Sequence, residues 1–125
     1  RAAALGARLA RARGEARLQV RADWFWTSPL AGWEMPDALR SELSVSGLII
    51  SKGDANYRRW LGDRHWPYDA PLDGVLGYAP APLALLRTCK SEVAAGIRPE
   101  RIAAASAQDP AWLTNGRWAV IQLRR

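Results

Sequence analysis

Two short apolar runs, residues 47–51 and residues 82–87, constrain the fold of this chain more than any other feature. The first is Gly-Leu-Ile-Ile-Ser and the second is Pro-Leu-Ala-Leu-Leu-Arg. A short continuous apolar run is typical of a strand that is covered on both faces, as in the centre of a parallel sheet. We therefore predict two buried strands at these positions.

Helical patterns alternate with these runs along the chain. Leu5 and Leu9 lie four residues apart among alanines and Gly14 follows, which predicts a helix over residues 2–13. Further helices are expected from Pro36 and over residues 55–61, 72–76 and 99–107.

Two more segments have the pattern of strands. Residues 16–22 alternate apolar and polar side chains, and residues 118–123 follow an Asn-Gly turn signal. Strands that alternate with helices predict an α/β fold, a three-layer α/β/α (Rossmann-like) domain with a mainly parallel sheet. We expect one domain over residues 1–125. The chain begins with Arg inside helical sequence and its single methionine is Met35, so we expect an N-terminally truncated domain.

The net charge of +6 invites a nucleic-acid-binding interpretation, in which the seven tryptophans would stack on bases. Much of the charge, however, comes from arginines near one end, and the others are scattered singly. The arginines near that end are Arg1, Arg8, Arg11, Arg13, Arg17 and Arg21. A general preference for arginine explains this distribution at least as well, so no nucleic-acid partner is expected. A basic nucleic-acid-binding domain remains an alternative.

Composition also bears on the compartment. No apolar run approaches the roughly 20 residues that a membrane-spanning helix needs, so no membrane partner is expected. Cys89 is the single cysteine, which excludes an internal disulfide and favours a reducing, cytoplasmic location. Cys89 is expected to be a small buried apolar residue.

The chain holds sixteen arginines and only two lysines, Lys52 and Lys90. An ammonium group is a compact point charge that suits a phosphate oxygen beside a metal ion, a role that a planar guanidinium fills poorly. The alternative is that both are solvated surface lysines kept by chance. Each lysine follows one of the two apolar runs. In open α/β sheets, ligands bind beyond the carboxyl ends of the strands, and two such ends that carry cations would concentrate positive potential at one crevice.

The first strand end carries the richer chemistry. Gly53 permits a positive φ or a close approach of ligand to backbone. Asp54 is a hard oxygen ligand for a divalent metal ion, although a carboxylate here could instead cap the following helix. Asn56 supplies a neutral donor and acceptor, and Lys52 and Arg58 are candidate phosphate-binding residues.

The second strand end carries Arg87 and Lys90, which could bind phosphate or could pair with surface carboxylates such as Glu92. Two other features are assigned to structure. His65, the single histidine, has no apparent carboxylate partner and is not expected to be a catalyst. The aromatic loop of residues 23–36 is interpreted as a hydrophobic plug over the sheet.

Several separated motifs, in order, resemble one known family. They are Lys52-Gly53-Asp54-Ala55-Asn56-Tyr57-Arg58-Arg59, Gly62-Asp63-Arg64-His65-Trp66-Pro67 and Leu86-Arg87-Thr88-Cys89-Lys90-Ser91-Glu92. Residues 23–36 and 112–118 fit the same pattern. Together they resemble the C-terminal part of the damage-control phosphatase family (domain of unknown function 89), in its acidic-residue methyltransferase-like branch. The resemblance covers about residues 5–123.

The resemblance implies a three-layer α/β/α domain that hydrolyses phosphate monoesters of small metabolites, such as sugar phosphates, with a divalent metal ion (Mn²⁺, Mg²⁺, Co²⁺ or Ni²⁺). In the family, the metal is held by an upstream Asp-Asn pair and by the Asp of the Lys-Gly-Asp motif, here Asp54. No Asp-Asn dipeptide occurs in this sequence, which agrees with a truncated start. The family's substrate-binding lysine corresponds to Lys90.

The sequence therefore predicts a metal-dependent phosphatase with Asp54 and Lys90 as catalytic residues and Asp54 as metal ligand. Substrate binding is assigned to Lys52, Asn56, Arg58, Arg87 and Lys90, and the partner is a small phosphorylated metabolite. Methyltransferase activity is not expected, because nothing in the sequence resembles a site for a nucleotide methyl donor. The main alternative is a domain that binds phosphometabolites without hydrolysing them.

Overall fold

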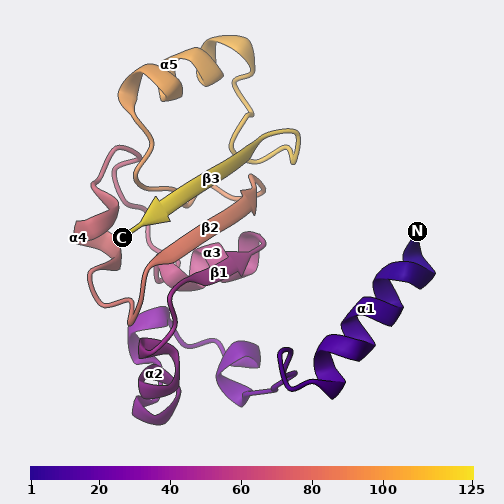
Figure 1. The fold of residues 1–125 in the computed structure, drawn as a ribbon. Coiled ribbons are helices and arrows are strands. Elements are labelled where there is room, and N and C mark those ends of the chain that lie inside the picture. Colours follow the sequence, from indigo (N-terminus) through magenta and orange to yellow (C-terminus); the bar gives the residue numbers. More distant parts are fainter.

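The computed structural model describes all 125 residues (Figure 1). Helices and strands occur in the order α1 (Ala2–Gly14), η1 (Trp24–Thr27), η2 (Gly32–Glu34), α2 (Asp37–Ser44), β1 (Ile49–Lys52), α3 (Asp54–Trp60), α4 (Leu72–Leu76), β2 (Leu83–Thr88), α5 (Pro99–Gln108) and β3 (Ala119–Arg124), where η denotes a 3₁₀ helix. The α/β class is confirmed. The helices predicted at residues 2–13, 55–61, 72–76 and 99–107 are present within one residue at each end.

The three strands form one mixed sheet in the order β1-β2-β3. β1 and β2 are parallel, with Ile49 opposite Leu83 and Lys52 opposite Leu86. β3 is antiparallel to β2, with Thr88 opposite Ala119. Because β1 and β2 run in the same direction, the residues that follow them lie at the same edge of the sheet.

One face of the sheet is covered by helices and by the aromatic loop. Leu83 and Leu85 of β2 are buried there against Tyr57 and Trp60 of α3. Phe25, in the η1 turn, is fully buried in the same cluster. The loop of residues 23–36 therefore acts as the predicted hydrophobic plug. A smaller cluster beneath α5 contains Cys89, which is buried as expected.

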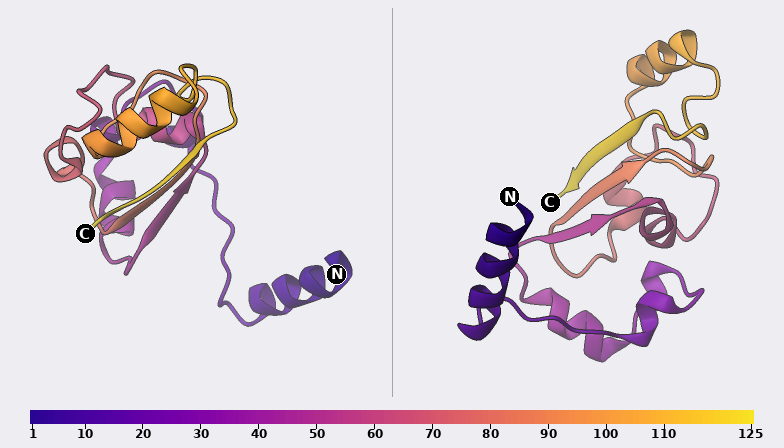
Figure 2. Two further views of the ribbon diagram at one scale, coloured as in Figure 1. Left: turned by 90° about the horizontal axis from the view of Figure 1, so that it is seen from above. Right: turned by 90° about the vertical axis from the view of Figure 1, so that its right-hand side faces the viewer.

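The opposite face of the sheet is open. Ile50 is 65% exposed, Ile121 is 81% exposed and Leu123 is 51% exposed, and all three alternate with side chains of the covered face. Seen from above, helices α3 to α5 lie on one side of the strands (Figure 2). β1 is thus an edge strand with one exposed face. The expectation of a central strand covered on both sides is wrong for β1 within this chain.

The amino-terminal segment lies apart from the rest. Helix α1 has no buried residue, and Figure 2 shows it displaced from the sheet at the end of an extended connection. Residues 16–22 form no strand, so the prediction of a strand there is wrong. Alternation alone is insufficient, because a strand needs a neighbouring strand to pair its backbone groups. No helix of the structure is both long and apolar enough to cross a membrane.

Candidate functional site at the carboxyl ends of strands β1 and β2

The chain turns sharply where β1 ends and α3 begins. Gly53 has φ +101° and ψ +157°, a conformation that only glycine adopts readily. Its N–H donates to the carbonyl of Leu86 in β2 at 2.8 Å. The amide of Asn56 donates to the carbonyl of Lys52 at 3.0 Å and closes the same turn. These bonds place Asp54, the first residue of α3, beside the end of β2.

Asp54 bonds across to the second strand end. Nε of Arg87 donates to Oδ1 of Asp54 at 2.7 Å, and the hydroxyl of Ser91 donates to the same oxygen at 3.2 Å. Oδ2 of Asp54 accepts no hydrogen bond, and the side chain is 17% exposed. Asp54 makes no capping bond to α3, whose N-cap is Gly53. The carboxylate is therefore anchored through one oxygen, and the capping alternative is excluded.

Arg87 is the only charged residue in the buried core. Besides the bond to Asp54, Nη1 donates to the carbonyl of Val93, and Nη2 donates to the carbonyl and to the hydroxyl of Ser91, the latter at 3.0 Å. The guanidinium carbon lies 4.5 Å from the centroid of the Tyr57 ring, a cation–π contact. The burial that this packing produces raises the pKa of the Tyr57 phenol. Taken together, the hydrogen bonds of Arg87 engage all three of its side-chain nitrogens with oxygen atoms of the protein.

The two lysines lie at the same edge of the sheet and form no ion pair. Lys52 is exposed and lines a cavity of about 300 Å³ on the open face, together with Thr88 and Ile121. Lys90 is also exposed, and its aliphatic chain lies beside Gly116, in the turn before β3. The alternative in which Lys90 pairs with Glu92 is not realised, and Arg87 pairs with Asp54 instead. Both ammonium groups remain available to an anion.

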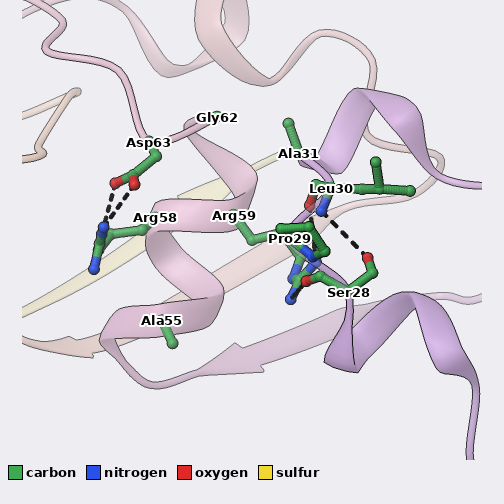
Figure 3. A pocket seen from close by; sticks show the side chains of 9 residues that line it. All are labelled: Ser28, Pro29, Leu30, Ala31, Ala55, Arg58, Arg59, Gly62 and Asp63. Atoms are coloured by element: carbon green, nitrogen blue, oxygen red, sulfur yellow. Dashed lines mark hydrogen bonds and ion pairs between the residues drawn. The ribbon is translucent and has the colours of Figure 1, made fainter.

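Arg58 lies one helical turn after Asp54 on α3, and its side chain points towards Asp63 (Figure 3). It forms two hydrogen bonds of 2.6 Å to Asp63, and this pairing lowers the pKa of the Asp63 carboxyl. The pair borders a cavity of about 180 Å³ between α3 and residues 28–31. Arg58 is therefore already neutralised by a carboxylate, in contrast to Lys52 and Lys90.

The adjacent Arg59 is a structural residue that the sequence did not reveal. Its side chain points to the other side of α3, towards the segment of residues 28–31 (Figure 3). It donates to the backbone carbonyls of Phe25, Trp26, Ser28 and Leu30, at distances of 2.8 to 3.1 Å. Arg59 thus fastens the aromatic plug to the helix that carries Asp54.

The loop after α3 is held by side-chain contacts. Asp63 bonds to Arg58, and the guanidinium of Arg64 lies 4.8 Å from the Trp33 ring centroid. His65 is exposed in this loop. No three side chains among His, Cys, Asp and Glu come close enough to form a metal site. The unengaged Oδ2 of Asp54 has the chemistry of one ligand to a divalent cation, and the chain supplies no complete ligand set.

Ser91 and Tyr57 belong to the site but were not predicted as site residues. Ser91 joins Arg87 to Asp54, and Tyr57 lies under the guanidinium. Their positions follow Arg87 by four residues and Asp54 by three. The only sequence signal was that Tyr57 lies within the motif of residues 52–59 and Ser91 within the motif of residues 86–92.

Comparison with known proteins shows the family to which the chain belongs. The model of the "Damage-control phosphatase ARMT1-like domain" matches residues 1–104. The chain belongs to this family. It is 46% identical over 102 residues to the damage-control phosphatase ARMT1 of Danio rerio, 40% to that of Rattus norvegicus and 39% to that of Homo sapiens. Each match covers 78% of this chain and 23% of the relative, so the chain spans about a quarter of these curated relatives. The resemblance found in the motifs is confirmed.

Proposed function

We propose that this chain carries part of the active site of a phosphatase that hydrolyses phosphate monoesters of small metabolites, including sugar phosphates. The carboxylate of Asp54, anchored through Oδ1 with Oδ2 unengaged, is the observation that carries the proposal. Membership in the damage-control phosphatase family supports a phosphatase, since the relatives are named damage-control phosphatases.

The two lysines are proposed to bind the phosphate group. Both residues are exposed and form no ion pair. Lys52 is the last residue of β1, and Lys90 lies two residues after the end of the parallel strand β2. Positive charge placed at the nonbridging phosphate oxygens stabilises the charge that these oxygens carry in the transition state. Lys52 lies beside the cavity on the open face of the sheet, where a phosphate group could reach it. Lys90 lies in the loop after β2 and is exposed there.

Asp54 is proposed to supply one ligand to a divalent metal ion, for which Mn²⁺, Mg²⁺, Co²⁺ and Ni²⁺ are candidates. When bound, such an ion polarises the phosphoryl group and orients the attacking water. Because this chain offers one carboxylate at the site, the remaining ligands must come from outside these residues. Asn56 is proposed to hold the turn that presents Asp54, since its amide donates to the backbone of Lys52.

The test is release of inorganic phosphate from a panel of sugar phosphates by the complete protein, with each metal in turn. Asp54→Asn preserves the shape of the side chain and removes its charge, and we expect at least a hundredfold loss of kcat. Asp37→Asn, an exposed aspartate at the start of α2, is the matched control and is expected to retain activity. An Asp54→Asn enzyme with unchanged kcat would contradict the assignment. Tight binding of sugar phosphates without phosphate release would instead support the non-catalytic alternative.

A further inference from the structure

The backbone groups on the outer edge of β3 have no partner. β3 is paired with a strand on one side only, where it meets β2. The carbonyl of Leu86 in β2 accepts from Gly53, on the side of β1, so its register partner Ile121 also points its backbone groups away from the β2–β3 ladder. Backbone groups alternate along an antiparallel strand, so those of Ala119 and Leu123 point the same way as those of Ile121. β3 therefore offers an open template for a further strand.

A groove runs along this edge, between β3 and α5. Figure 2 (right) shows α5 on the side of β3 that faces away from β2. The groove has a volume of about 420 Å³, and the indole rings of Trp112 and Trp118 line it. Their N–H groups already donate to the side chains of Ser106 and Asp109, at 3.1 and 2.9 Å. The two rings therefore offer apolar surface to the groove.

The charge in the groove is positive. Arg98 and Arg101 line it from the side of α5, and no acidic residue lines it. Arg101 forms no ion pair, and Nε of Arg98 lies 3.2 Å from a carboxylate oxygen of the exposed Glu100. An exposed pair of this kind contributes only about 0–1 kcal/mol, so Arg98 can exchange Glu100 for another carboxylate. A polypeptide that enters the groove therefore binds more tightly if it carries negative charge.

We propose that this groove binds an extended acidic peptide of another protein, which adds to the sheet as a fourth strand beside β3. The peptide backbone pairs with the outer edge of β3, its apolar side chains contact the two indole rings, and its carboxylates pair with the two arginines. Strand addition of this kind takes its affinity from backbone hydrogen bonds and its specificity from the side chains. The inference does not depend on the proposed phosphatase activity, because β3 and β1 lie at opposite edges of the sheet.

A second copy of this chain fits the same edge less well. Two β3 strands paired antiparallel about Ile121 would bring Arg117 of one copy opposite Arg125 of the other. Like charges that stand opposite each other in a sheet are unfavourable, and charged side chains on an edge strand oppose such pairing. Charge complementarity therefore favours an acidic partner over self-association.

The experiment uses the complete protein and a fluorescein-labelled peptide of sequence Glu-Val-Glu-Val-Glu-Val-Glu, whose binding is followed by fluorescence anisotropy. We expect saturable binding that is about tenfold weaker in Arg101→Glu, because the reversed charge repels the peptide. Arg13→Glu is the matched control: it makes the same change of charge in α1, which has no buried residue, and is expected to leave the affinity unchanged. The same peptide N-methylated throughout keeps its charges but has no N–H to donate to β3, and we expect it not to bind.

Hydrogen exchange at single-residue resolution locates the bound peptide. We expect the peptide to slow exchange of the amides of Ala119, Ile121 and Leu123. The amides of Val120 and Gln122 point towards β2, so their exchange should change little. This alternation is the signature of a strand added to β3, and charge attraction without backbone pairing would not produce it.

Absence of binding to the wild-type protein would overturn the proposal. Equal affinity for the N-methylated peptide would overturn it as well, because it would show that charge alone attracts the peptide. Equal affinity of the wild type and Arg101→Glu would exclude the role given to the groove. Slow exchange of the three outward amides in the free protein would show that another segment or a second copy already covers the edge, and would contradict an acidic partner there.

Discussion

Nε of Arg87 donates a hydrogen bond of 2.7 Å to Oδ1 of Asp54, 33 residues away in the sequence, and this pair joins the ends of strands β1 and β2. The register places Lys52, two residues before Asp54, opposite Leu86, the residue before Arg87. The pair is buried on the arginine side and partly open on the aspartate side. A charged residue is tolerated in this core because its charge is matched and its donors are occupied.

The Asp54–Arg87 pair is expected to show strong energetic coupling. Removing one partner leaves a buried or half-buried charge without compensation, which costs about 3–5 kcal/mol. We expect Asp54→Ala and Arg87→Met each to lower the free energy of unfolding by about 3 kcal/mol, and the double variant to lose clearly less than their sum. Urea unfolding of the four proteins measures this coupling. Strict additivity would show that the two side chains do not interact in solution.

Gly53 is expected to be intolerant of any side chain for conformational reasons. No atom lies within 4 Å of the position where a Cβ would stand, so space is not the constraint. The backbone at φ +101° and ψ +157° is unfavourable for other residues, and we expect Gly53→Ala to lower the free energy of unfolding by about 1–3 kcal/mol.

Gly47→Ala is the matched control for that substitution. Gly47 also has open space around it, but its φ is not positive, so denaturant unfolding should show little change. Equal effects of the two substitutions would contradict the conformational explanation.

Arg59 is expected to control the stability of the aromatic plug. Its guanidinium donates to four backbone carbonyls between Phe25 and Leu30, and an ammonium group cannot reproduce that fork. We expect Arg59→Lys to cost about 2 kcal/mol and to speed hydrogen exchange of the amides of residues 25–30. Arg58→Lys, in an exposed pair with Asp63, should cost less than about 1 kcal/mol. The reverse order would refute the role given to Arg59.

Acid is expected to loosen the turn before β3. The Trp118 indole and the Asn115 amide both donate to Asp109, and these bonds hold the pKa of its carboxyl below the ordinary value. Since the pKa is lowered by folding, the resulting stability is present above the unfolded pKa of about 3.9 and is lost as pH falls through the lowered value. Trp118 fluorescence should report this change, and Asp109→Asn should remove much of its pH dependence. An unaltered acid profile in that variant would contradict the assignment.

The sequence predicted that the two strand ends meet, but not the contacts between their side chains. The apolar runs and Gly53 predicted two strand ends that meet, because parallel strands present the same end at one edge. The role of Arg87 was not predictable, since an arginine after a strand can extend into solvent or fold under a neighbouring helix, and only packing against Tyr57 decides. The alternating pattern of residues 16–22 gave no strand, because no strand lies beside it.

The open face of the sheet is a feature of the fold that the sequence did not predict. Ile50 and Ile121 have the apolar character of buried strand residues, yet both are largely exposed. A hydrophobic pattern records that a face suits burial, and it does not record which segment covers it. The class of fold was therefore predictable, and the exposure of one face of β1 was not.

The most direct test of the account is anomalous diffraction from crystals of the complete protein grown with Mn²⁺ and a non-hydrolysable phosphate analogue. We predict a manganese peak bonded to Oδ2 of Asp54, with Arg87 still bonded to Oδ1 and the ammonium groups of Lys52 and Lys90 against the phosphate oxygens. A manganese ion remote from Asp54, or a phosphate bonded to Arg87, would contradict it.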